Sequence, residues 1–278
     1  MAGNKSVRCA RLQEILRQKI LLFQEISEFP TLVIKGHVGA LASYSIADKQ
    51  IICDAQLLRE PYEVQEEVIM HELCHHVLRT LYGSALISLI DEMCAVKLMQ
   101  EKDPKSFKTW MRIGHLLDPM DRQHYSCYGY DPEEIECALY WAIGIHEREC
   151  SPQYLFETIS LEFYFSNYSD ARKFAKSYNI TNVKKGDKMF GVTFGKISFL
   201  QKCEGIYNVL IVKKIPESIK EWIALGKKEY EEAMKFKSFI TVCIGLGKIS
   251  FCVPIDDHRG SFLHFYTTRN NKPTWNHR

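Results

Sequence analysis

The sequence predicts a mixed α+β protein in two domains, because its residue pattern changes three times along the chain. Apolar residues first recur at helical spacing over residues 7–28. Three short strand-like runs follow, and then a series of helical patterns reaches about residue 178. Strand-like runs dominate the remainder. We therefore expect a domain over residues 1–180, with a small antiparallel sheet and several helices, and a smaller α/β domain over residues 184–278.

The composition is that of an ordinary globular protein. Of its 278 residues, 46% are hydrophobic and 25% are charged. The 36 basic and 34 acidic residues leave a net charge of +2, which gives no electrostatic argument for a nucleic-acid or membrane partner. None of the ten cysteines falls in a C-x-x-C pair, the first residues form no apolar leader, and no run approaches the ~20 apolar residues of a membrane span. We expect a cytoplasmic protein with reduced cysteines.

The first domain begins with a helix and a small sheet. The stripe of apolar residues over residues 7–28 indicates an amphipathic helix, and Pro30 ends it. Runs of β-branched and apolar residues then predict three strands, over residues 31–34, 41–46 and 50–53. Because the last two are separated by a short polar turn, we expect an antiparallel sheet.

Helical patterns occupy most of the rest of this domain. A helix over residues 62–82 should end near Gly83, and Ser84 should cap a second helix that reaches about Glu101. Further helices are predicted over residues 105–117, 131–145, 152–164 and 168–178.

The second domain is expected to follow a polar connector at residues 183–188. Beyond it, a charged helix is predicted over residues 216–236. Strands are predicted over residues 189–200, 206–213, 238–254 and 261–268.

The helix over residues 62–82 carries the pattern His71-Glu72-Leu73-Cys74-His75. Two histidines four residues apart project from one helix face, so both imidazoles can bind the same tetrahedral metal ion. Glu72 follows the first histidine directly, and there its carboxylate can remove a proton from the water of the metal. The alternative is a chance spacing on a polar helix face. The good helix propensity of the surrounding residues favours the metal site.

A catalytic zinc site needs a third protein ligand and leaves a fourth position open. Glu92 lies 17 residues after His75, on the next predicted helix, and the small Ala95 would let the two helices approach. Alternatively, Glu92 forms a surface salt bridge or supports a ligand, and Asp91 or a later residue is the third ligand. Asp91 is otherwise expected on the helix surface, or as a hydrogen-bond partner of a ligand histidine.

These residues resemble the gluzincin class of zinc metallopeptidases, and within it the ImmA/IrrE-type family. The resemblance lies in H-E-L-x-H at residues 71–75, in E-x-x-A at residues 92–95 of a helix that continues to Leu98-Met99, and in the strand just before. It covers roughly residues 30–101. It implies a zincin-like domain in which His71, His75 and Glu92 hold Zn²⁺ while Glu72 acts as general base.

Other polar residues have less specific interpretations. His76 is expected to be structural or exposed, and Cys74 to pack in the core. The strand over residues 41–46 could hold an extended peptide at a free sheet edge, or be an ordinary paired strand. One further group could stabilise an oxyanion or simply pack between helices: His115, His124, Tyr125, Tyr128 and Tyr130.

The sequence as a whole predicts a zinc-dependent endopeptidase whose partner is an intracellular protein or peptide substrate. One alternative is a zincin fold without catalytic activity that serves as a regulatory or binding module. Another is a protease domain that acts on DNA-bound partners, which the near-zero net charge disfavours.

Overall fold

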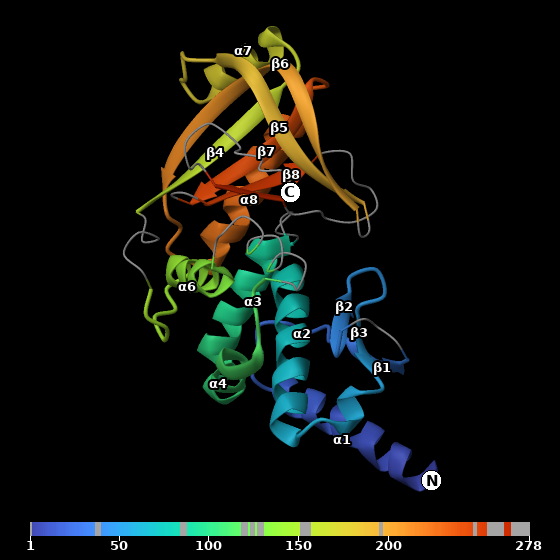
Figure 1. The fold of residues 1–278 in the computed structure, drawn as a ribbon. Coiled ribbons are helices and arrows are strands. Elements are labelled where there is room, and N and C mark those ends of the chain that lie inside the picture. Colours follow the sequence, from blue (N-terminus) through green and yellow to red (C-terminus); the bar gives the residue numbers. More distant parts are fainter. Residues whose placement is uncertain are drawn as a thin grey trace. The chain divides into compact units, whose positions relative to one another are not determined.

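The computed structural model confirms a mixed α+β fold (Figure 1). It describes residues 2–36, 40–83, 88–117, 122, 126, 131–150, 157–194, 197–246, 249–254 and 264–267. The chain forms two compact units. The first comprises Met1–Arg122, Ile143–Ile145 and Glu217–Ile223, and the second comprises Gln123–Ala142, His146–Pro216 and Ala224–Arg278. Within the described residues, no helix is both long and apolar enough to cross a membrane.

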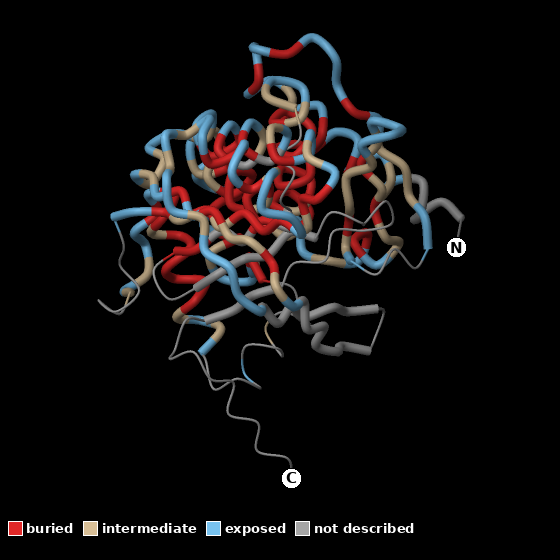
Figure 2. Tube along the Cα trace, turned by 90° about the horizontal axis from the view of Figure 1, so that it is seen from above, coloured by how far each residue is buried: buried red, intermediate tan, exposed pale blue. Residues whose placement is uncertain are grey.

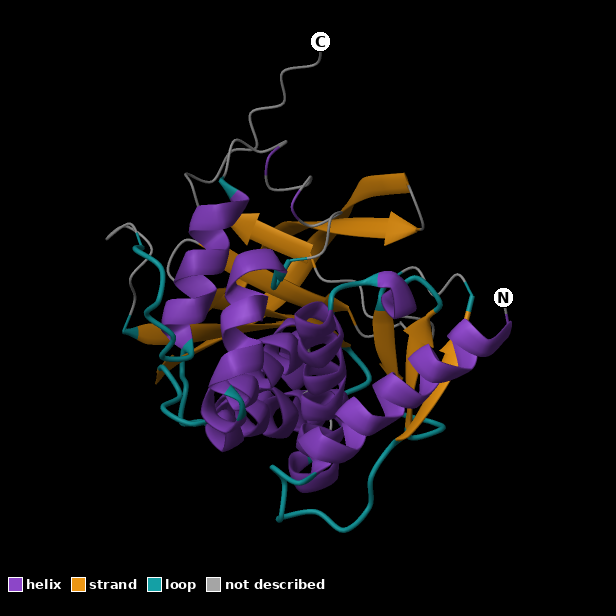
Figure 3. Cartoon of the chain, turned by 90° about the horizontal axis from the view of Figure 1, so that it is seen from below, coloured by secondary structure: helices purple, strands orange, loops and turns teal. Residues whose placement is uncertain are grey.

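The first unit is built from four helices, a short 3₁₀ turn and a three-stranded sheet. In chain order these are α1 (Ala2–Ile20), β1 (Thr31–Lys35), β2 (Ala42–Ser45), β3 (Gln50–Asp54), η1 (Leu57–Arg59), α2 (Tyr62–Tyr82), α3 (Ser88–Lys102) and α4 (Pro104–Ile113). The helix at the N label in Figure 3 is α1, which packs against β1 and α2.

Helix α1 is displaced from the range that the sequence predicted, since it starts at Ala2 and stops at Ile20 rather than spanning residues 7–28. The amides of Leu22 and Phe23 bond to carbonyls three residues back, which is the tighter hydrogen bonding of a helix end. This turn still buries Phe23 and Ile26. The apolar stripe over residues 7–28 therefore predicts which residues are buried, but it does not predict the length of the helix.

The small sheet is mixed, so the prediction of an antiparallel sheet is wrong. Its strand order is β1-β3-β2. Strand β2 pairs antiparallel with β3, with Tyr44 opposite Ile51, whereas β1 pairs parallel with β3, with Val33 opposite Ile52. Parallel neighbours need a crossover, and here the chain supplies it by passing through β2 before it returns as β3.

Helix α2 is the centre of the first unit and is buried over most of its length. Figure 2 colours the chain by burial, with buried residues in red. It contacts α1, α3, α4 and β2. As predicted, it ends at Gly83, whose φ of 78° suits glycine and whose amide bonds to the Arg79 carbonyl at 3.0 Å. Helix α3 begins at Ser88 in the described chain, and Ser84, the predicted cap, lies outside the described residues.

Helix α4 begins at Pro104, as the sequence indicates, but ends at Ile113 instead of residue 117. Its cap is Asp103, whose side chain accepts the amide of Ser106.

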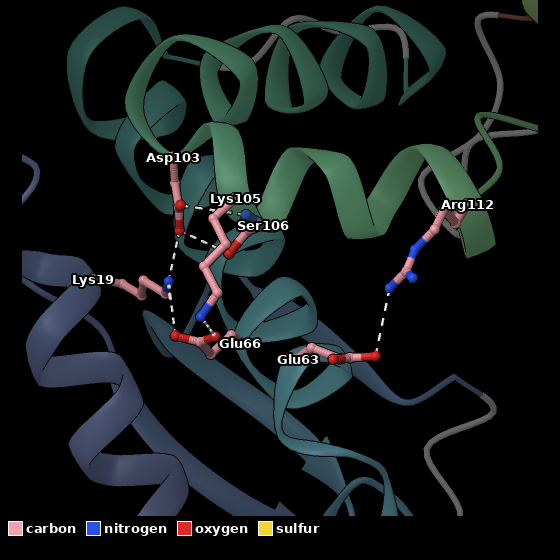
Figure 4. A network of polar contacts seen from close by, with 7 residues as sticks. All are labelled: Lys19, Glu63, Glu66, Asp103, Lys105, Ser106 and Arg112. Atoms are coloured by element: carbon pink, nitrogen blue, oxygen red, sulfur yellow. Dashed lines mark hydrogen bonds and ion pairs between the residues drawn. The ribbon is translucent and has the colours of Figure 1, made fainter.

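Asp103 also joins a buried ion-pair network that connects three helices (Figure 4). Lys19 of α1 lies 2.6 Å from an Asp103 oxygen and 3.3 Å from a Glu66 oxygen on α2. Lys105 adds a second cation at Glu66. Burial opposes the charge on Asp103, but its hydrogen bonds from Lys19 and Ser106 outweigh burial and hold its pKa below the usual value.

The second unit contains a six-stranded sheet with helices. Its elements are α6 (Pro132–Ala142), β4 (Thr158–Phe165), α7 (Tyr168–Ser177), β5 (Lys184–Phe194), β6 (Ile197–Lys214), α8 (Ile219–Met234), β7 (Phe239–Leu246), β8 (Ile249–Pro254) and β9 (His264–Thr267), the first turn of α8 belonging to the other unit. The strand order is β5-β6-β4-β7-β8-β9, and every neighbouring pair is antiparallel. This unit is therefore α+β and not α/β.

Two sequence predictions are wrong here. The helix predicted over residues 152–164 is replaced, from Thr158 onward, by β4, which lies in the interior of the sheet and buries Ile159, Leu161 and Phe163 on alternate positions. A polar connector was predicted at residues 183–188, but the chain from Lys184 onward belongs to strand β5, which pairs with β6. Lysines are common on edge strands because they discourage pairing with other chains, so polarity there does not mark a boundary.

The ion-pair network gives a stability prediction. Replacing Lys19 with Met should lower the free energy of unfolding by about 3 kcal/mol, because two buried carboxylates lose a cation. Arg17→Met on the same helix is the matched control, since its pair with Glu14 is exposed and should contribute about 0.5 kcal/mol or less. Urea unfolding of both variants measures this, and equal losses would show that the buried network adds nothing.

Candidate metal centre

The two histidines of the pattern lie one turn apart on α2, as their spacing predicts. Their Nε2 atoms face each other at 3.1 Å, and the ring centroids are 4.7 Å apart. Each residue is only 7% exposed. Because α2 is surrounded by α3, α4 and the small sheet, the two imidazoles are held within the first unit and not on its surface.

Glu92 reaches the same point from α3. One of its oxygens lies 3.0 Å from His71 Nε2, and the other lies 3.3 Å from His75 Nε2. Ala95, one turn later on α3, is fully buried, and α3 packs closely against α2. The Glu92 side chain is 37% exposed, so the group of three donors is open to solvent on its carboxylate side.

The donor set fits a zinc ion. Two ligands bound at 2.0–2.1 Å to one tetrahedral zinc are themselves about 3.3 Å apart. Here His71 Nε2 lies 3.1 Å from His75 Nε2 and 3.0 Å from Glu92 Oε2, and His75 Nε2 lies 3.3 Å from Glu92 Oε1. Both oxygens of the Glu92 carboxylate therefore face the pair of histidines. Two imidazole nitrogens and one carboxylate are also a common ligand set of catalytic zinc. Residues His71, His75 and Glu92 therefore have the spacing and the chemistry to hold this metal together.

The electrostatics of the group favour a cation. Burial disfavours charge on His75, but Glu92 and Asp91 outweigh it and hold the pKa of His75 well above the usual value. Burial likewise opposes charge on Glu92, and the two histidines outweigh it and lower the pKa of that carboxyl. The negative charge of these carboxylates can be balanced either by a metal ion or by protons on the histidines.

Glu72 lies beside the ligand group and is buried. Burial raises its pKa, while His71 and His75 lower it and Glu92 raises it further. The backbone amide of Tyr44, on strand β2, also hydrogen-bonds its carboxylate. Glu72 is thus placed between the donor group and the edge of the small sheet.

Asp91 is a hydrogen-bond partner of His75 and not a further donor to the metal. Its Oδ2 accepts a hydrogen bond from His75 Nδ1 at 2.9 Å and another from Arg79 Nη2 at 3.0 Å. Of the three interpretations of Asp91, as third ligand, surface residue or hydrogen-bond partner of His75, the last is the one found. Such carboxylates orient a ligand imidazole and raise its basicity. Arg79 follows His75 by one helical turn, and that spacing could have indicated its role.

Sequence reasoning missed two further residues of this site. The indole of Trp110, on α4, is stacked on the ring of His71, with centroids 4.4 Å apart and planes 9° apart. Glu67 precedes His71 by one turn of α2, and burial raises the pKa of its carboxyl to about 7. The spacing of Glu67 was visible in the sequence, whereas nothing in the sequence shows which side of α4 faces His71.

The remaining candidates do not join the group. His76 is buried, with Nε2 donating to the Glu28 carbonyl at 2.8 Å and Nδ1 accepting from the Tyr44 hydroxyl at 2.9 Å. It is therefore structural, and Cys74 is packed in the core as predicted. His115 is exposed and contacts Arg122. The other members of that cluster lie outside the described residues: His124, Tyr125, Tyr128 and Tyr130.

Asp91 gives a prediction about metal affinity. Asp91→Ala should weaken zinc binding about 10- to 100-fold, because His75 loses the acceptor that fixes its ring. Competition with a chromophoric chelator measures the affinity. Glu101→Ala, an exposed change on the same helix, is the matched control and should leave the affinity unaltered. If Asp91→Ala binds zinc as tightly as wild type, Asp91 does not support the metal site.

Comparison with known proteins adds no relative. No family model matches the chain, and neither a curated protein nor a solved structure matches it. The interpretation of the metal centre consequently depends on the residues of this chain and their geometry.

Proposed function

We propose that this protein is a zinc-dependent peptidase that hydrolyses peptide bonds of a protein or peptide substrate. The observation that carries the proposal is the convergence of His71, His75 and Glu92 at zinc-ligand spacing, with Glu72 buried next to them. A purely structural zinc site is normally closed by four protein ligands. Only three donors meet in the described group, and the Glu92 side chain is partly exposed, as an open fourth position for water and substrate requires.

A zinc ion held by these three residues would activate a water molecule and polarise the scissile carbonyl. Glu72 would accept a proton from the attacking water and later deliver it to the leaving amine. The carboxylate ends each cycle in the state in which it began, so the proton balance is closed. Burial raises the pKa of Glu72, and a more basic carboxylate is a better proton acceptor.

The small sheet supplies two further elements of the proposal. Strand β2 has β3 on one side only, so it is an edge strand within the described sheet. The amide of Tyr44 on this strand is close enough to Glu72 to lower the pKa of its carboxyl. An extended peptide bound along the same edge would pass close to Glu72.

Replacement of Glu72 by Gln tests the proposed base. We expect Glu72→Gln to bind one zinc ion per chain and to lose at least about a hundredfold of the hydrolysis rate, since the amide cannot accept the proton. Cleavage of a peptide library, followed by mass spectrometry, measures the rate.

Glu63→Gln is the control for that experiment, because Glu63 is an exposed acid on the same helix. Undiminished cleavage by Glu72→Gln would contradict the mechanism. A wild-type protein that holds zinc and cleaves no peptide would instead favour a zincin fold with a regulatory or binding role.

A further inference from the structure

The two ligand histidines are held in place by different means. His75 has the arrangement that is usual for a metal ligand, because its second ring nitrogen donates to the carboxylate of Asp91. The corresponding atom of His71, Nδ1, is buried and has no hydrogen-bond partner among the described residues. A ring without that hydrogen bond is free to rotate about its bond to Cβ unless another contact prevents it.

The contact that His71 does have is the stacked indole of Trp110. The two ring planes are only 9° from parallel, and their centroids are 4.4 Å apart. Trp110 is itself buried. Rotation of the imidazole out of this plane would push its edge into the indole. The stack therefore restricts the ring in place of a hydrogen bond at Nδ1.

The backbone of Gly114 lies close to the indole of Trp110. A Cβ atom at Gly114 would lie 2.5–2.8 Å from three atoms of the Trp110 ring, closer than real Cβ atoms approach. Only glycine therefore allows the chain to lie this near to the indole. Gly114 therefore limits how far the Trp110 ring can move toward this part of the backbone.

Helix α4, which carries Trp110, is fixed at its start as well. Asp103 caps it and pairs with Lys19 of α1. The position of the indole is thus set at both ends of the helix, by Gly114 at one and by the ion-pair network at the other.

We propose that Trp110 is a positioning residue for the metal centre, which orients His71 by stacking as Asp91 orients His75 by a hydrogen bond. This inference rests on the zinc site of the proposed function. Its consequence is that His71 Nε2 stays aimed at the point where His75 and Glu92 meet. Loss of the indole should therefore weaken metal binding and alter the ligand geometry, even though Trp110 does not touch the metal.

Three variants of helix α4 test this role. Trp110→Leu should weaken zinc binding about tenfold in a chelator competition and change the visible absorption band of the cobalt(II) form, which reports ligand geometry. Trp110→Phe keeps a flat ring and should recover most of the affinity and the wild-type band. Phe107→Leu, also a buried aromatic on α4, is the matched control and should leave both measurements unchanged.

Several results would overturn the inference. One is a Trp110→Leu protein with wild-type zinc affinity and cobalt spectrum, and another is a Phe107→Leu protein that loses as much affinity as Trp110→Leu. If Trp110→Leu does not fold, Gly114→Ala decides, since its methyl group would press on the indole. An unchanged cobalt spectrum in Gly114→Ala would then refute the role of Trp110. Wild-type protein that binds neither metal would refute the zinc site itself, and this inference with it.

Discussion

Two imidazoles, placed one turn apart on a single buried helix, set the requirements for the packing around them. Their Nε2 atoms can meet at 3.1 Å only if α2 stays helical from His71 to His75, and they can face Glu92 only if α3 packs closely along α2. Ala95, one turn after Glu92 on α3, is small and buried. The fold around α2 can therefore be understood as the support of one small group of polar atoms.

Burial of so many polar residues on one helix is costly unless each has a partner. Glu66 is paired with Lys19, His76 lies between Tyr44 and a backbone carbonyl, and His75 is bonded to Asp91. The exceptions are informative. The Nδ1 atom of His71 is without a partner among the described residues, and an aromatic stack takes over the task of holding that ring.

The parts of this site that follow local rules could be predicted from the sequence. The spacing of His71 and His75, the end of α2 at Gly83 and the return of Glu92 on the next helix all result from helix geometry and turn chemistry. What depends on distant segments could not be predicted. The parallel pairing of β1 with β3, strand β4 within the large sheet and the rotation that points Trp110 at His71 are each set by tertiary packing.

X-ray absorption at the zinc edge can show whether His71, His75 and Glu92 hold one zinc ion together. We expect one zinc per chain in a shell of nitrogen and oxygen at about 2.0–2.1 Å, with the signature of two imidazoles. Zinc bound through sulfur at about 2.3 Å would contradict this expectation, because the buried Cys53, Cys74 and Cys94 have no place in the proposed site. Purified protein that takes up no stoichiometric zinc would contradict it as well.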